Sequence, residues 1–350
     1  MINKGIHSKK SGQFKQRAAP PLVNLDFIKG LPSWAEINPY EDSLPKIIAV
    51  GGGKGGVGKS LVSANIAAQL ALSGARTLVV DLDVGGPNLH TYFGLPMPSP
   101  TLNSYWNDRQ VTFSDLLIPC PVPRLAMIAG GSSAEAGKHT LNKEHLSRFW
   151  CDLKIAKNKY KISYVILDLG AGSQEYTVEL FSCAHLGILT ILPEPTSIEN
   201  AYVFLKAHLW KLIENSGYFI DNPREAAMVQ RELLKGQPND ISNGYFAKLQ
   251  NLFHAHPTLI KCLGSAITSR KIGIIINQAR NSGDRDIGGS IEEICRQFFG
   301  LKTTSLGYLN YDEAAWKSLR NKRLLSKDFP HSLITKRIRS ICKNINKLTV

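Results

Sequence analysis

The sequence predicts an α/β fold, with a doubly wound, mainly parallel sheet and helices on both of its faces. Short apolar runs of strand length alternate with segments of helical period along most of the 350 residues. The first such run breaks into a cluster of glycines and then into a helical pattern, an arrangement typical of parallel sheets. Since a chain of this length accommodates one large domain with insertions, we expect a single domain.

The composition indicates a soluble protein. Hydrophobic residues make up 43% of the chain, yet no run approaches the about twenty apolar residues that a membrane-spanning helix needs. Residues 1–20 hold five basic residues and no acidic ones, and they lack the apolar segment of a secretory signal. We therefore expect a cytoplasmic protein.

The beginning of the chain predicts an arm. Residues 1–45 mix Lys, Gly, Ser and Pro with little periodicity, so we expect a flexible N-terminal arm before a folded domain over 46–350. The six cysteines are dispersed and have no Cys-x-x-Cys spacing, which disfavours an iron–sulfur cluster site. We expect them to be reduced and mostly buried.

Residues 46–60 predict a strand, a phosphate-binding loop and the start of a helix. The apolar run Ile47–Val50 reads as a buried strand, and the helical pattern Ser60–Leu72 is closed by Gly74. Between them lies Gly-x-x-x-x-Gly-Lys-Ser, in which glycines let backbone N–H groups surround phosphate oxygens. Lys59 would neutralise the β- and γ-phosphates, and Ser60 would offer an oxygen to Mg²⁺. The nucleotide-binding candidates are Gly53, Gly55, Gly56, Val57, Gly58, Lys59 and Ser60.

Two later strands end in carboxylates. Thr77–Asp81 leads into Leu82 and Asp83, and Tyr164–Asp168 is followed by a glycine-rich turn. Open α/β sheets bind ligands at the carboxyl ends of such strands. These aspartates therefore predict a metal or catalytic site beside the phosphate loop, with a helix cap or turn carboxylate as the alternative.

The remaining elements complete the predicted sheet. We expect strands at 125–129, 186–192, 272–276 and 303–306, helices at 141–155 and 198–214, and a loop-rich segment at 91–117. Thr196 or Ser197 is the expected cap of the helix that follows them. Residues 216–269 hold two amphipathic segments and predict a helical insertion, which either extends the core or docks a partner.

The carboxyl-terminal part of the chain is strongly basic. Residues 316–350 hold ten Lys and Arg against one Asp, a net charge of +9 out of +14 for the whole chain. This concentration indicates either attraction to DNA phosphate or anionic lipid, or a solvated basic face. Apolar residues at helical spacing in 331–350 predict a closing helix that packs on the sheet, and a membrane-surface helix is the alternative.

Three of these patterns together resemble the MinD/ParA class of P-loop ATPases. Lys54 directly after Gly53 resembles the deviant phosphate loop of that class, 81–89 resembles its switch I, and 164–172 resembles its Walker B strand and switch II. The resemblance runs from Ile47 to Leu348 and is closest to the MinD and FlhG branch.

The resemblance implies roles for particular residues. Lys54 would reach the phosphates of the partner subunit in an ATP-sandwiched dimer, and Asp83 would orient the attacking water, so Lys54, Lys59 and Asp83 are the catalytic candidates. Ser60, Asp81 and Asp168 would hold Mg²⁺, while Gly170 or Gly172 would give an N–H to the γ-phosphate. Asn277 would contact adenine. At the second wall of the adenine pocket, Leu309-Asn310 replaces a proline that the class usually has.

The expected function is an ATP-binding and ATP-hydrolysing dimerisation switch for spatial regulation, placing flagella, the division site or other cargo. Its expected partners are a second copy, a protein, and an anionic surface of membrane lipid or nucleoid DNA to which the basic end would attach peripherally. A kinase or synthetase on the same core is one alternative, although no tyrosine follows Tyr311 as it would in a tyrosine kinase tail. A metal-cluster carrier is the other alternative.

Overall fold

The computed structural model describes residues 44–83, 86–131, 143–215, 270–299 and 301–349, with isolated positions between 224 and 255. Almost all of the expected arm (1–45) and most of the expected insertion (216–269) lie outside the described residues. Both remain predictions.

Eight strands form one sheet in the order β3-β4-β2-β5-β1-β6-β7-β8. Neighbouring strands pair in parallel, except for β3 and β4, which are antiparallel. The strands are β1 (Lys46–Gly51), β2 (Thr77–Leu82), β3 (Ile118–Pro119), β4 (Leu125–Ile128), β5 (Tyr164–Leu169), β6 (Leu186–Ile191), β7 (Lys271–Ala279) and β8 (Thr303–Asn310). The predicted, mainly parallel sheet is therefore confirmed.

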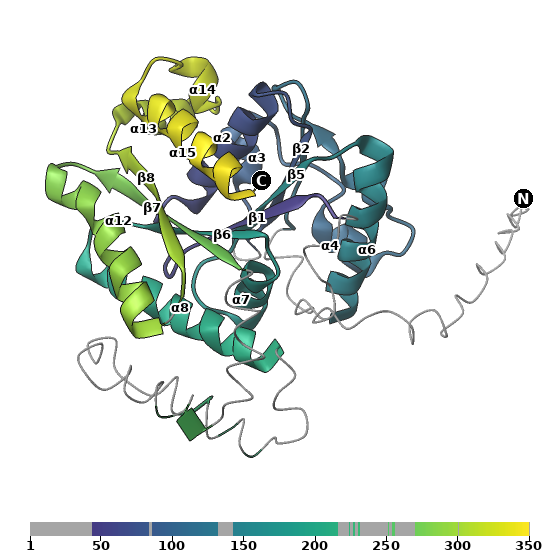
Figure 1. Cartoon of the computed structure of the whole chain (residues 1–350). Helices are drawn as coiled ribbons and strands as arrows, with labels where there is room; N and C mark the ends of the chain where they lie inside the picture. Colours follow the sequence, from purple (N-terminus) through teal and green to yellow (C-terminus); the bar gives the residue numbers. More distant parts are fainter. Residues whose placement is uncertain are drawn as a thin grey trace, which may run out of the picture.

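Helices cover both faces of this sheet (Figure 1). One face carries α2 (Lys59–Leu72), α3 (Leu89–Tyr92), α13 (Glu313–Arg320), α14 (Leu325–Asp328) and α15 (Leu333–Thr349). The other carries α4 (Leu102–Asn107), the 3-10 turn η2 (Phe113–Leu116), α6 (Lys143–Tyr160), α7 (Glu175–Ser182), α8 (Pro195–Asn215), α12 (Ser282–Ile294) and the π-helical turn η4 (Cys295–Phe299). The doubly wound arrangement is confirmed as well.

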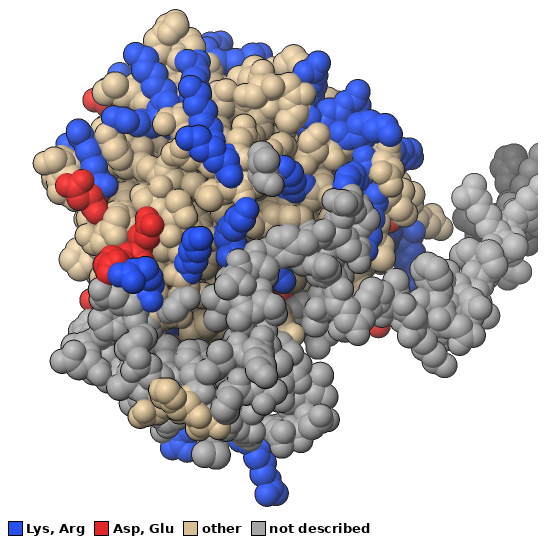
Figure 2. All heavy atoms as spheres, viewed as in Figure 1, with Lys and Arg blue, Asp and Glu red and all other residues tan. Residues whose placement is uncertain are grey.

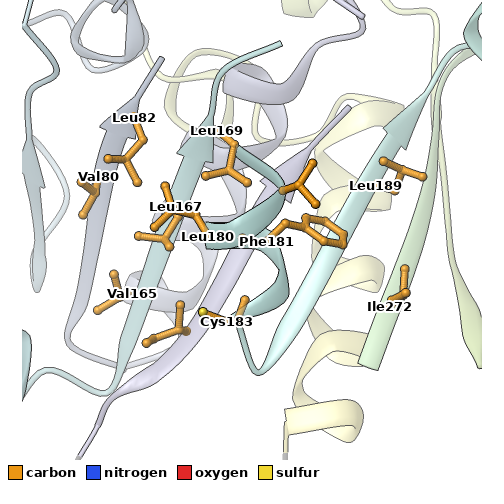
Figure 3. Packing of buried hydrophobic residues seen from close by; sticks show 14 of the residues in the cluster. Val80, Leu82, Val165, Leu167, Leu169, Leu180, Phe181, Cys183, Leu189 and Ile272 are labelled. Atoms are coloured by element: carbon orange, nitrogen blue, oxygen red, sulfur yellow. The ribbon is translucent and has the colours of Figure 1, made fainter. Parts of the chain in front are cut away.

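The alternation of side chains along the strands divides the core into two clusters. In β1, Ile47 and Ala49 pack on one face, whereas Ile48 and Val50 pack on the other. Figure 3 shows the first cluster, where Leu167 of β5 lies near residues of α7. Because both faces of the sheet are buried, its strands are continuous apolar runs in the sequence.

Several expected boundaries are wrong. Helix α6 spans Lys143–Tyr160, strand β8 runs on to Asn310, and the segment 91–117 contains the end of α3 together with α4 and η2. Helix α8 begins at Pro195, whose fixed φ suits the first turn of a helix. Thr196 and Ser197 therefore lie inside α8 and do not cap it. Instead, the Ser197 hydroxyl accepts the N–H of Leu192 at 3.0 Å.

The carboxyl-terminal helix closes the fold. Helix α15 packs against α2 and β8, and its isoleucines at 334, 338, 341 and 345 are buried there. The prediction of a closing helix is confirmed. The apolar face of α15 is thus part of the core.

Candidate functional site

The candidate site lies at the carboxyl edge of three central strands. The glycine-rich loop connects β1 to α2, and the register of β2 and β5 places Asp81 beside Asp168. Ligands of open α/β sheets bind at this edge, where the strand order reverses. The fold therefore brings together the loop and the aspartates that the sequence singles out.

Contacts at the loop explain its glycines. Gly56 and Gly58 adopt φ angles of 77° and 93°, which side chains disfavour. A Cβ at Gly53 would lie 2.2 Å from the carbonyl oxygen of Asn200, and one at Gly58 would lie 2.2 Å from Nδ2 of Asn277. Hence this backbone conformation requires glycine at these positions.

Below the loop lie a buried lysine and a buried carboxylate. Burial lowers the pKa of Lys59, while Asp168 and Asp83 act in the opposite direction. Burial raises the pKa of Asp168, against hydrogen bonds from Ser60 and Ser63, the latter donating to Oδ1 at 2.9 Å. Oδ2 of Asp168 is buried without a hydrogen-bond partner among the described residues.

This chemistry fits a Mg²⁺–nucleotide ligand. Phosphate oxygens would compensate the buried ammonium of Lys59, and a water of a hydrated cation would give Oδ2 of Asp168 its partner. The hydroxyl of Ser60 already contacts the same carboxylate. Lys59, Ser60 and Asp168 thus lie together as expected, and their ligand contacts remain a prediction.

Asp81 shapes the turn that carries Asp83. Its Oδ1 accepts the N–H of Asp83 at 3.1 Å, and its Oδ2 accepts the N–H of Leu89 at 3.0 Å. Burial raises the pKa of Asp81, and neighbouring Asp168 raises it further. The turn carboxylate that the sequence allowed as an alternative is therefore present, while a role in the metal shell remains a prediction.

The turn after β5 contacts both the loop and Asp83. The N–H of Gly172 donates to the carbonyl of Gly52 at 3.1 Å, so it already has a partner. A Cβ at Gly170 would lie 3.5 Å from Oδ1 of Asp83. The N–H of Gly172 is thus engaged with the loop, and a contact of either glycine with a γ-phosphate remains a prediction.

Lys54 has two partners that the sequence did not reveal. Its Nζ donates to Oε2 of Glu194 at 3.1 Å and to Oγ1 of Thr196 at 3.2 Å. Both belong to the segment where β6 passes into α8, at the same edge of the sheet. The only sign of these partners in the sequence was that their segment follows the end of a predicted strand.

A pocket of about 570 Å³ adjoins the loop. Asn277 and Gln278 line it beside Gly56 and Gly58, and Nδ2 of Asn277 donates to the carbonyl of Val57 at 2.8 Å. Asn277 thus braces the loop, a role that the sequence did not indicate, and its contact with adenine remains a prediction.

The outer wall of this pocket is aromatic. Tyr311 and Trp316 line it and are 56% and 59% exposed, and Arg280 lies 4.3 Å from the centre of the Tyr311 ring. Leu309 is buried in the core, whereas Asn310 lines the pocket. Sequence reasoning missed the two aromatic residues, although both follow the last strand.

Charge is concentrated near this wall. Lys and Arg side chains gather on the face that carries α13 and α15 (Figure 2). Within the described part of the chain, no helix is long and apolar enough to cross a membrane.

Comparisons with known proteins point to a nucleotide-binding family. Residues 48–325 match the model of the CobQ/CobB/MinD/ParA nucleotide binding domain. The flagellum site-determining protein YlxH of Helicobacter pylori is 29% identical over 204 residues, which cover 57% of this chain and 66% of that protein. The antiactivator FleN of Pseudomonas aeruginosa is 32% identical over 161 residues, covering 46% of this chain and 55% of that protein.

Other relatives include an iron–sulfur cluster carrier protein of Rickettsia felis, 27% identical over 52% of this chain and 57% of that protein. In all three cases the chain covers less than two thirds of the relative's length. Among solved structures, the cell division ATPase MinD of Pyrococcus furiosus superimposes with a TM-score of 0.55 at 17% identity, over 87% of this chain and 100% of that one. This likeness supports the same fold.

Proposed function

Because this chain belongs to the CobQ/CobB/MinD/ParA nucleotide-binding domain family, we propose that it is an ATP-hydrolysing dimerisation switch. ATP would join two copies, the dimer would hold a surface or partner, and hydrolysis would release it. The observation that carries the proposal is the convergence at one sheet edge of buried Lys59 and Asp168 with half-buried Asp83, and with Lys54 at the same loop.

Each residue has a distinct part in the proposed reaction. Lys59 stabilises negative charge on the β- and γ-phosphates, and the N–H of Gly170 donates to the γ-phosphate. Ser60 and Asp168 would hold Mg²⁺, which would neutralise phosphate charge when bound. Asp83 positions the attacking water, and Lys54 adds charge stabilisation across the dimer.

The proposed cellular role is the placement of flagella, the division site or other cargo. It is supported by the match to a flagellum site-determining protein and to an antiactivator. Peripheral attachment of a cytoplasmic dimer to anionic lipid or DNA through the basic carboxyl-terminal region belongs to the same proposal. A cluster carrier is the second candidate because of the match to iron–sulfur carriers, but this sequence has no Cys-x-x-Cys.

Two lysine variants test the switch. Lys59→Ala should abolish ATP binding in calorimetric titration, since the buried ammonium is the charge placed for the phosphates. Lys54→Ala should still bind ATP as a monomer, yet fail to form a dimer with a slowly hydrolysed ATP analogue, as measured by sedimentation. Lys302→Ala, an exposed lysine before β8, is the control.

The outcomes separate the parts of the proposal. Unchanged ATP affinity in Lys59→Ala would refute the phosphate-loop assignment. A normal ATP-dependent dimer in Lys54→Ala would refute the action of that lysine across the interface. A coloured, iron-containing protein purified without oxygen would instead favour the cluster carrier.

A further inference from the structure

We propose that Glu194 and Thr196 form a clasp that holds Lys54 within its own subunit and so opposes ATP-driven dimerisation. This inference rests on the proposed function, in which Lys54 must reach the phosphates of a second copy. The clasp sets how much nucleotide and protein are needed before that dimer forms.

The clasp has defined geometry. The ammonium of Lys54 has three N–H donors, and two of them are directed at Oε2 of Glu194, at 3.1 Å, and Oγ1 of Thr196, at 3.2 Å. These donors cannot at the same time serve phosphate oxygens of a partner. With two of its three donors held in its own subunit, Lys54 can offer a partner's phosphates its full set of hydrogen bonds only after it leaves Glu194.

The frame around the clasp is closely packed and hydrogen-bonded. The backbone of Gly53 lies so close to α8 that a Cβ there would be 2.2 Å from the carbonyl oxygen of Asn200. The carbonyl of Glu194 accepts the N–H groups of Ser197 and Ile198 at 3.0 and 3.1 Å, which fixes the residue at the start of α8. Loop and helix are thus held together, while the side chain of Lys54 remains free to exchange partners at a surface where it is 30% exposed.

The exposure of the pair limits the size of the effect. Exposed ion pairs of this kind shift an equilibrium by about two- to five-fold. Formation of a dimer breaks two clasps, one in each subunit. The dissociation constant of the dimer therefore changes by the square of this factor, about four- to twenty-five-fold. Salt screens such a pair, so the effect should shrink as ionic strength rises.

The test compares full-length wild type with Glu194→Gln and Thr196→Val. The dissociation constant of the dimer is measured by sedimentation with a slowly hydrolysed ATP analogue at low and high salt. Glu194→Gln should tighten the dimer about four- to twenty-five-fold at low salt and less at high salt, and Thr196→Val should tighten it by less. Glu199→Gln, in the first turns of α8 just after Glu194, is the matched control for loss of one negative charge.

A second measurement reads the clasp in the nucleotide-free monomer. The rate at which acetic anhydride modifies Lys54, followed by mass spectrometry of its peptide, should rise about two- to five-fold in Glu194→Gln. The rate in Glu199→Gln should match the wild type. This measurement does not depend on dimer formation.

The possible results are distinguishable. If wild type dimerises with the analogue and Glu194→Gln dimerises equally well or more weakly, the clasp is refuted and the switch stands. An unchanged acetylation rate of Lys54 in Glu194→Gln also refutes the clasp. If wild type forms no dimer with the analogue, the proposed function fails and the regulatory role of the clasp fails with it.

Discussion

Helices α13 and α15 are both amphipathic and basic, but they use their apolar residues in opposite ways. Helix α15 buries its isoleucines against α2 and β8. Helix α13 buries Ala314 and Ser318, and it leaves Trp316 59% and Leu319 36% exposed. Both helices present Lys and Arg to solvent on the face shown in Figure 2.

The difference separates a structural helix from a ligand-facing one. Trp316 and Leu319 line the pocket beside the phosphate loop, so a ligand rather than the core is available to cover them. Helical periodicity is present in both segments, because it records only that apolar residues share a face. What that face contacts depends on the tertiary structure.

The largest expected effect concerns the buried face of α15. Ile341→Ala removes a side chain that is 2% exposed, and it should lower the free energy of unfolding by about 2–5 kcal/mol. Leu319→Ala, the matched control on α13, should change it by no more than about 0.5 kcal/mol. Urea unfolding followed by circular dichroism measures both. Equal losses in the two variants would remove the distinction between the helices.

Some elements of the fold could be predicted from local sequence patterns and others could not. Runs such as Ile47–Val50 and Tyr164–Asp168 predict strands correctly, because strands buried on both faces are apolar throughout. The start of α8 was predicted three residues too late, since a capping pattern at Thr196-Ser197 competed with a proline at the first helical position. Local patterns could not decide between these two signals.

The site divides in a similar way. Lys59, Ser60 and Asp168 could be predicted, because the spacing of the loop and the end of a strand place them. The contact of Lys54 with Glu194 joins residues 140 positions apart, and no local spacing encodes it. Trp316 was missed because α13 reaches the pocket only when β8 pairs with β7 in the folded sheet. No local pattern in the sequence shows that pairing.

The next largest effect concerns the exposed face of α13 that lines the pocket. We expect the base of ATP to stack on the exposed Trp316 ring in the pocket. Because base–aromatic stacking contributes about 1–3 kcal/mol, Trp316→Ala should weaken ATP binding about 5- to 150-fold. Affinity for inorganic triphosphate, which has no base, should stay unchanged. Calorimetric titration of both ligands measures this, with Trp106→Phe on remote α4 as the control. A parallel loss of triphosphate affinity would show that Trp316 supports the loop and not the base.

The smallest expected effect concerns the basic face that the two helices share. Lys343 is exposed on α15, on the side away from its buried isoleucines. A single lysine near an anionic surface contributes about 1 kcal/mol, so Lys343→Ala should weaken attachment of the ATP-bound protein about five-fold for each subunit that contacts the surface. Co-sedimentation with DNA and with anionic vesicles at low salt measures it, and Lys302→Ala, before β8, is the control.

The dependence of attachment on salt distinguishes DNA from lipid, and it tests the different roles of α13 and α15. Because the isoleucines of α15 lie in the core, this helix exposes little apolar surface beyond Leu333, and most attachment through it should be lost at high salt on both DNA and vesicles. A salt-resistant fraction on vesicles alone would have to come from exposed apolar residues such as Trp316 and Leu319, and Trp316→Ala would then remove it. If instead that fraction persists in Trp316→Ala and disappears in Ile341→Ala, α15 must leave the core to bind the membrane, and its assignment as a closing helix would hold only for the unattached protein.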